Sequence, residues 1–247
     1  MKVAGYADAD RMVPVMFLVI AVTVALYGLT APILARRLGV TQPDPRGILI
    51  AGAHRFSRDL AKCLKDAGIQ TMLVDRNWSN VSMARIAGLN VVYGDILDES
   101  LVDEAVSKGM GRLMALTPND KVNCLAAIQY AECFEHKNVY QLPLHKGAEA
   151  GLSGAEMPGH LLGRILFKPE LTYESLQELM DNGYRIKLTT LSNSFTIENY
   201  HEQYGGEAIP LMVIRDAADT LVTAGDKPKP AAGAKLLGLV PPVDTVV

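Results

Sequence analysis

The sequence predicts an α/β protein in which a Rossmann-like parallel sheet is preceded by one transmembrane helix and followed by a small α+β lobe. Strand-like apolar runs alternate with amphipathic helical segments between residues 47 and 142, a pattern typical of parallel sheets with right-handed crossovers. An uncharged apolar stretch at residues 12–35 is long enough to cross a bilayer. A glycine-rich segment without hydrophobic periodicity, residues 146–163, separates the alternating part from the remainder of the chain.

These observations divide the chain into five predicted parts. They are a transmembrane helix at 12–35, a proline-containing linker at 36–46, an α/β domain at 47–145, a second linker at 146–163 and a small α+β domain at 164–247.

The uncharged stretch is followed at once by Arg36 and Arg37. Positive charge gathers on the cytoplasmic side of membrane helices, so we expect a single-pass protein of the cell membrane, with its N-terminus outside and its main domain in the cytoplasm. A cleaved signal peptide fits less well, because the apolar region is too long and the positive charge follows it instead of preceding it. The lipid bilayer is therefore a predicted partner.

The net charge and the cysteines argue against a nucleic-acid interface, a disulfide framework and a metal site. The formal net charge is −3, so nucleic acid is not a predicted partner. The cysteines Cys63, Cys124 and Cys133 form no C-x-x-C pair, which indicates reduced thiols in a cytosolic compartment. Cys133 and His136 have the spacing of two metal ligands, but nothing near them in the sequence completes a set, so no metal site is predicted.

The predicted sheet is organised around residues 47–76. An apolar run at 48–51 indicates a buried strand, and a helix follows in which Phe56, Leu60 and Leu64 fall on one face. A second apolar strand at 71–74 ends at Asp75, so this segment predicts a βαβ unit. Further strands are predicted at 90–93, 112–116 and 139–142, with helices beginning near 77, at 98 and at about 121, the last running to 136.

The C-terminal part has a less regular pattern. It predicts a helix at 172–182, strands at 184–191 and 235–240, and a hairpin that joins 208–214 to 220–223 around residues 216–219.

The turn after the first strand departs from the dinucleotide-binding pattern G-x-G-x-x-G, because the three glycine positions hold Gly52, His54 and Ser57. The glycine replaced by His54 normally lets the backbone approach a pyrophosphate, whereas the N-terminus of the following helix can still attract an anion. His54, Arg55 and Arg58 can add positive charge there. The alternative is a βαβ unit that binds nothing.

Short motifs follow four of the predicted strands in a fixed order. They are Gly52, Asp75, Gly94-Asp95 and Thr117-Pro118-Asn119-Asp120, with Asn123 and Leu125-Ala126-Ala127 in the next helix. In these motifs residues 47–142 resemble an RCK/KTN domain, also called TrkA-N. This is the regulatory Rossmann domain of potassium channels, potassium transporters and some cation:proton antiporters.

The segment LYGLTAPILARRLGV, which runs into this domain, resembles the last membrane helix of a sodium/proton antiporter and its exit. The resemblance implies a regulatory domain of a monovalent cation:proton antiporter, and not an enzyme. One helix without an acidic residue cannot form an ion pathway, so we expect a C-terminal fragment or a subunit that partners an antiporter membrane domain.

The same resemblance implies a nucleotide at the carboxyl edge of the sheet, either NAD(H) or an adenine mononucleotide, and a homodimer. The contacts it implies are Gly52, His54, Phe56 and Ser57 for phosphate, Asp75 and Arg76 for ribose, Asp95 and Ile96 for the base, and Thr117 in the crevice. Since His54 replaces a glycine, the turn argues against tight dinucleotide binding and favours a mononucleotide or a degenerate site.

Two other functions stay open at this point. A membrane-anchored NAD-dependent oxidoreductase would need a proton donor beside the hydride acceptor, and the sequence contains no Y-x-x-x-K pair, so no catalytic residue is predicted. A non-binding dimerisation domain is the other. For this function, the helix after residue 121 has an apolar stripe that could form an interface, although a place in the core is the default expectation: Val122, Leu125, Ala126, Gln129 and Cys133.

Overall fold

The computed structural model describes residues 9–37, 45–145, 163–215, 220–226 and 230–242. Most of both predicted linkers therefore lies outside the described residues, as does the predicted hairpin turn at 216–219. The chain separates into two units, Met1–Asp44 and Pro45–Val247, which are described in turn.

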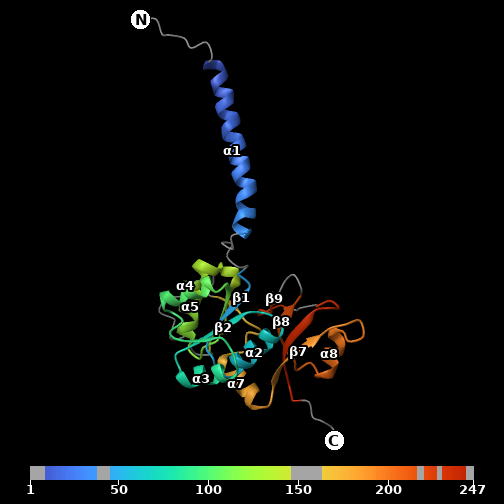
Figure 1. Ribbon diagram of the computed structural model, residues 1–247. Helices are drawn as coiled ribbons and strands as arrows, with labels where there is room; N and C mark the ends of the chain where they lie inside the picture. The colour runs from blue at the N-terminus through green and yellow to red at the C-terminus, as the bar shows by residue number, and fades with distance from the viewer. Residues whose placement is uncertain (1–8, 38–44, 146–162, 216–219, 227–229, 243–247) are drawn as a thin grey trace. The chain divides into compact units, whose positions relative to one another are not determined.

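The described residues of the N-terminal unit form the helix α1 (Ala9–Arg37), drawn in blue in Figure 1. It confirms the predicted helix and extends it at both ends. Its segment Val13–Ala31 is long and apolar enough to cross a membrane. The apolar side chains described on α1 are exposed all around the helix, Phe17 and Leu29 among them. A helix with an apolar surface on every side is typical of a membrane span.

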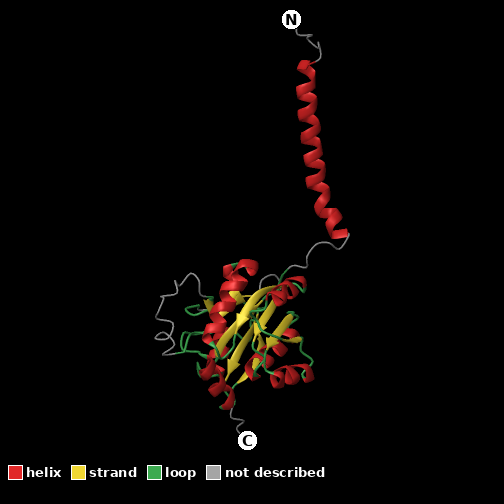
Figure 2. Ribbon diagram, turned by 90° about the vertical axis from the view of Figure 1, so that its left-hand side faces the viewer, coloured by secondary structure: helices red, strands yellow, loops and turns green. Residues whose placement is uncertain are grey.

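The C-terminal unit is built on a six-stranded parallel sheet, seen as yellow arrows in Figure 2. Its strands are β1 (Gly47–Ala51), β2 (Thr71–Asp75), β3 (Val91–Tyr93), β4 (Met110–Ala115), β5 (Val139–Gln141) and β6 (Arg164–Ile165), in the order β3-β2-β1-β4-β5-β6. This is the strand order of a Rossmann fold, with the chain reversing direction across the sheet between β1 and β4. The predicted parallel sheet is confirmed.

Helices connect the strands, and asparagine or aspartate begins three of them. The helices are α2 (Arg55–Asp66), α3 (Trp78–Ile86), α4 (Glu99–Ser107) and α5 (Asp120–Phe134), followed by the short 3-10 helix η1 (His136–Asn138). The side chains of Asn77, Asp98 and Asn119 accept hydrogen bonds from the first-turn backbone of α3, α4 and α5. The predicted end of α5 at residue 136 was wrong by two residues, because Glu135 adopts a left-handed φ of 61° that the helix cannot continue through.

The two faces of the sheet are buried in different clusters. Ile48 and Ile50 of β1 pack with α2 on one face, while Leu49 and Ala51 pack with α4 and α5 on the other. The continuous apolar runs of the central strands follow from this double coverage.

The buried face of α5 differs from the apolar stripe predicted on this helix. Ala126 is buried, together with Ala127, Tyr130 and Phe134, whereas Leu125 and Cys133 are exposed. Leu125 and Cys133, the exposed part of the stripe, therefore do not belong to the hydrophobic core.

A second, four-stranded antiparallel sheet follows, with the order β7-β10-β8-β9. Its elements are α7 (Tyr173–Asp181), β7 (Arg185–Thr190), α8 (Ile197–Gln203), β8 (Ile209–Ile214), β9 (Thr220–Leu221) and β10 (Lys235–Val240). The predicted helix, strands and hairpin pairing are confirmed. Helix α8 was not predicted, and β6, which the sequence analysis assigned to the C-terminal part, completes the first sheet instead.

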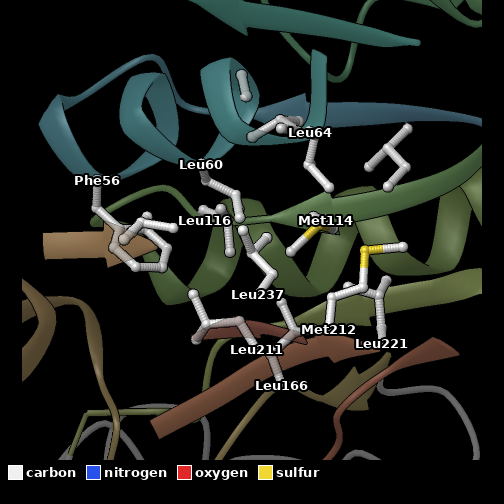
Figure 3. Packing of buried hydrophobic residues seen from close by; sticks show 14 of the residues in the cluster. Phe56, Leu60, Leu64, Met114, Leu116, Leu166, Leu211, Met212, Leu221 and Leu237 are labelled. Carbon is white, nitrogen blue, oxygen red and sulfur yellow. The ribbon is translucent and has the colours of Figure 1, made fainter. Parts of the chain in front are cut away.

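The C-terminal lobe, residues 166–240, packs against α2 and shares one hydrophobic cluster with the parallel sheet. Figure 3 shows Phe56, Leu60 and Leu64 of α2 on one side of this cluster, with Leu211 and Leu237 of the second sheet on the other. Burying side chains of this size contributes about 1.5–3 kcal/mol each. The lobe and the parallel sheet are thus joined by a continuous core.

Candidate functional site

A cleft with a volume of about 230 Å³ opens at the carboxyl edge of the parallel sheet. Its walls come from the segments that follow four adjacent strands: Gly52 after β1, Val74 to Arg76 at the end of β2, Gly94 to Ile96 after β3, and Thr117 to Asn119 and Val122 after β4. In open α/β sheets ligands bind in such a crevice, at the point where the strand order reverses. The cleft is smaller than the roughly 300–1,000 Å³ typical of drug-sized ligands.

Gly52 forms the floor of the turn between β1 and α2. It has a left-handed φ of 98°, and a Cβ atom there would lie 3.3 Å from the Leu116 carbonyl oxygen. Its backbone N–H donates to the carbonyl of Val74 at 2.7 Å. Glycine is therefore required by both the backbone conformation and the close approach of β4.

Asp75, at the end of β2, ties this turn to the next helix. One carboxylate oxygen accepts from the Ala53 backbone N–H at 2.7 Å and from the Asn80 side-chain amide at 2.9 Å. The other accepts from the Asn77 backbone N–H at 2.7 Å. A carboxylate has about four acceptor positions, so one remains to accept from a ligand hydroxyl.

Arg76 and Asp95 pair across the mouth of the cleft, with 3.2 Å between guanidinium and carboxylate, and both are well exposed. The Asp95 carboxylate also accepts from the Leu97 backbone N–H at 3.1 Å. Ile96 is buried and, with Val74 and Val122, supplies apolar wall. An apolar slot bordered by a charged pair suits a flat heterocyclic ring with polar edges.

Asn123 fixes the wall formed after β4, and the predicted site did not include it. Its side-chain oxygen accepts from the Thr117 backbone N–H at 3.0 Å and from the Thr117 hydroxyl at 2.7 Å. Its side-chain amide donates to the Thr117 carbonyl at 2.9 Å, and the residue is 1% exposed. A polar residue on the otherwise apolar face of α5 was the signal in the sequence that this side chain has a buried partner.

His54 points away from the cleft and is buried between the turn and the C-terminal lobe. Its Nε2 lies 2.8 Å from the Leu116 carbonyl oxygen and 3.0 Å from the Ser57 hydroxyl. A carbonyl can only accept, so Nε2 carries the hydrogen and donates. Nδ1 then accepts from the side-chain amide of Gln177 in α7, at 3.2 Å. The Tyr173 ring packs edge-on against the imidazole, with 4.9 Å between centroids.

Burial of His54 favours the neutral form of its imidazole. Loss of hydration lowers the pKa of the imidazole from 6.5 to about 4, although the hydrogen bond to Leu116 opposes this shift. The side chain is therefore neutral at pH 7. The expectation that His54 adds positive charge to the turn was wrong.

The two arginines beside the turn also have protein partners. Arg58 donates to the Ala53 carbonyl at 2.6 Å, and Arg55 lies 3.6 Å from the Asp181 carboxylate at the end of α7. Phe56 and Ser57 are both fully buried, and Phe56 belongs to the core cluster.

The structure thus brings together most of the predicted contact residues and leaves out the rest. Those that line the cleft are Gly52, Asp75, Arg76, Asp95, Ile96 and Thr117. The side chains of His54, Phe56 and Ser57 point into the protein. The arrangement can bind a sugar hydroxyl and a flat ring. In the part of the chain that the structure describes, no cluster of metal-ligating side chains occurs.

Residues 48–142 match the family model described as the TrkA-N domain. No curated protein sequence matches the chain. Among solved structures, the chain is similar to the GsuK RCK domain, with a TM-score of 0.39 and 18% identity, over 79% of this chain and 44% of that one. This chain therefore spans less than half of the GsuK RCK chain.

Two smaller solved domains are also similar. The TrkA-N domain of the inner membrane protein ybaL from Escherichia coli gives a TM-score of 0.38 and 16% identity, over 44% of this chain and 81% of that one. The NAD(P)-binding domain of an exopolyphosphatase-related protein from Archaeoglobus fulgidus gives a TM-score of 0.40 and 14% identity, over 55% of this chain and 96% of that one. The family-model match runs from β1 to β5 and includes every residue that lines the cleft.

Proposed function

We propose that this chain is a membrane-tethered regulatory module that binds a nucleotide through its adenosine group and transmits its occupancy to an ion-transport protein. The observation that carries the proposal is the cleft at the carboxyl edge of the TrkA-N domain, where Asp75 lies between the turn after β1 and the start of α3.

The chemistry of the walls supports an adenosine group. Asp75 has an acceptor position left for a ribose hydroxyl, as carboxylates at the end of the second Rossmann strand provide. The apolar side chains of Val74, Ile96 and Val122 can enclose an adenine ring, and Asp95 can accept from its amino group. The titratable side chains that line the cleft are already hydrogen-bonded or ion-paired, so we propose binding without catalysis.

The proposed membrane location rests on α1. Its segment Val13–Ala31 is long enough to span a bilayer, and Arg36 and Arg37 follow it, which supports a cytoplasmic location for the domain that follows. This segment contains no acidic residue, so the ion pathway belongs to a partner. We propose a monovalent cation:proton antiporter as that partner, because residues 26–40 resemble the last helix of such proteins.

The test measures binding to the full chain in detergent micelles by titration calorimetry, with AMP, ADP, ATP and NAD. Trp78, the only tryptophan in the sequence, packs against Tyr93 next to the cleft residue Gly94, with 5.5 Å between ring centroids, so its fluorescence gives a second signal. A nucleotide at about 100 times its Kd should add roughly 2.7 kcal/mol to the free energy of unfolding.

A blocking variant tests whether the cleft is the site. A Cβ atom on Gly94 would meet only the Val92 side chain, at 4.0 Å, so Gly94→Phe should fold and fill the cleft. We expect affinity to fall at least about tenfold. The control variant Ala87→Phe adds the same side chain at an exposed position, at the C-terminal end of α3. It should bind the nucleotide with unchanged affinity. Absence of binding by any of the four nucleotides, or normal binding by Gly94→Phe, would contradict the proposal.

A further inference from the structure

Exposed apolar side chains gather on helix α3 and the neighbouring strand β3. Among the described residues of the C-terminal unit, five large apolar side chains are exposed, and four of them lie on these two elements: Trp78, Met83, Ile86 and Tyr93. Single exposed apolar residues are common on protein surfaces, whereas a group of them marks an interaction site. These four residues and Arg85, which is also exposed, are called the α3 surface below.

The members of the α3 surface lie close together at the outer edge of the parallel sheet, where β3 is the last strand. Helix α3 turns its two buried residues toward the sheet, so Met83 and Ile86, three positions apart, face outward as neighbours. The Trp78 ring lies edge-on to the Tyr93 ring, with 5.5 Å between centroids. The Arg85 guanidinium lies over the same Trp78 ring, 5.1 Å from its centroid. Aliphatic, aromatic and cationic groups thus share one face.

The charge of this region is positive, although the whole chain has a formal net charge of −3. Residues 76–94 contain two arginines and no acidic residue, and Arg85 is the one that stacks on Trp78. Lys65 adds a positive charge beside the end of α3, because its ammonium group donates to the Gly88 carbonyl at 2.8 Å. A second copy of the chain would bring positive charge against positive charge. The partner that complements the α3 surface is therefore both apolar and negatively charged.

The connection to α1 brings a surface of that kind within reach. Helix α3 runs back from the carboxyl edge of the sheet, so its last turn lies at the edge where β1 begins. Residues 38–46 join α1 to β1, and an extended chain of this length spans at most about 30 Å. With α1 in a bilayer, the start of β1 stays within that distance of the lipid.

We propose that the α3 surface docks on an anionic lipid surface. Trp78 and Tyr93 lie at the level of the headgroups, where aromatic rings with a polar edge are favoured. Ile86 enters the acyl boundary, and Arg85 attracts acidic headgroups. This inference rests on the proposed membrane location of α1 and is independent of nucleotide binding.

Trp78 reports on this docking directly, because it is the only tryptophan in the sequence. The full chain is inserted into vesicles of phosphatidylcholine alone, and into vesicles of equal parts phosphatidylcholine and phosphatidylserine. Bromine on the acyl chains of the phosphatidylcholine quenches tryptophan fluorescence at short range. We expect strong quenching in the vesicles that contain phosphatidylserine and little in the neutral ones. Raising the salt from 0.1 M to 1 M shortens the Debye length from about 10 Å to about 3 Å and should weaken the quenching.

Variants test whether the α3 surface is the part that docks. Met83→Asp and Ile86→Asp each place a carboxylate on this surface, and each should remove most of the quenching. The matched control is Leu125→Asp on α5, because Leu125 is 52% exposed and Met83 is 50% exposed. It should leave the quenching unchanged. Circular dichroism checks that each variant is folded, and the second α3 variant keeps the test decisive if the first is not.

Several outcomes would overturn the inference. They are absence of quenching in the inserted protein, equal quenching in the two kinds of vesicle, equal losses in Met83→Asp and Leu125→Asp, or quenching that follows protein density instead of lipid charge. Each of these leaves the proposed membrane location and nucleotide binding standing. Failure of the chain to float with the vesicles would overturn the membrane location as well.

Discussion

The carboxyl edge of the parallel sheet consists of two halves with opposite surroundings. Polar, partly exposed residues after β2, β3 and β4 line an open cleft, Asp75, Gly94-Asp95 and Thr117 among them. The buried side chains of Leu116, directly after β4, and Leu142, after β5, belong instead to the hydrophobic cluster that the sheet shares with the C-terminal lobe. One half is thus open to a ligand, and the other attaches the lobe. The difference shows that neighbouring residues at one edge of a Rossmann sheet can serve a cleft and a core.

The largest effect is expected where the closed half is packed most tightly. Phe56 is fully buried, and its ring lies edge-on to Phe167, 6.1 Å between centroids. Phe56→Ala should lower the free energy of unfolding by about 3–5 kcal/mol, because it leaves a cavity between α2 and the lobe. Urea unfolding of the full chain followed by circular dichroism measures this loss.

Ile86→Ala is the matched control on the open half. Ile86 is 81% exposed on α3, so its truncation should change the free energy of unfolding by no more than about 0.5 kcal/mol. Equal losses for the two variants would mean that the two halves are not packed differently.

A pH effect of intermediate size follows from His54. The unfolded chain takes up a proton near pH 6.5, whereas the folded state keeps the imidazole neutral down to a pKa of about 4. Stability is therefore full above pH 6.5 and should fall by about 3 kcal/mol as the pH drops toward 4. Urea unfolding at pH 7 and pH 4.5 measures the change in the full chain.

Other groups titrate in the same range, so the contribution of His54 is the difference between the unaltered protein and His54→Gln. The variant cannot take up a proton at this position and should lose less stability on acidification. An identical pH dependence would place His54 in an exposed position, contrary to the structure.

The smallest effect is expected at the mouth of the cleft. Arg76 and Asp95 form an ion pair, but their side chains are 76% and 40% exposed. Arg76→Ala should change the free energy of unfolding by less than about 1 kcal/mol, because water and salt screen exposed pairs. Thermal unfolding of the unaltered protein and of Arg76→Ala should show a small difference in Tm at low salt, and this difference should disappear at high salt. A loss as large as that of Phe56→Ala would mean that the open half also holds the fold together.

The strands and helices of the parallel sheet could be predicted from the sequence because their signals are local. Each strand is an apolar run, and capping residues such as Asn77 and Asp98 mark where helices begin. Strand β6 has two residues, too few for a pattern, and its place depends on pairing with β5. Helix α8 buries only Tyr200, so its sequence has no apolar periodicity.

The site could be predicted where backbone position alone decides the outcome. Gly52, Asp75 and Thr117 follow strands that end at the same edge, so the fold brings them together. The direction of the His54 side chain could not be predicted, because its partner Gln177 lies 123 residues later in the sequence. Spacing within a motif places a residue on the turn, but tertiary packing decides which way its side chain points.

The packing of the lobe on α2 has a consequence for chain synthesis. The apolar face of α2, with Phe56, Leu60 and Leu64, is covered by α7, β7 and residues of β8 and β10, which lie between residues 173 and 240. A ribosome has therefore completed all of residues 48–142 before that cover exists, and the face stays exposed to chaperones or to neighbouring chains in the meantime. The family-model match ends at residue 142, whereas the hydrophobic cluster that includes α2 continues to β10. We expect a chain truncated at that boundary to aggregate.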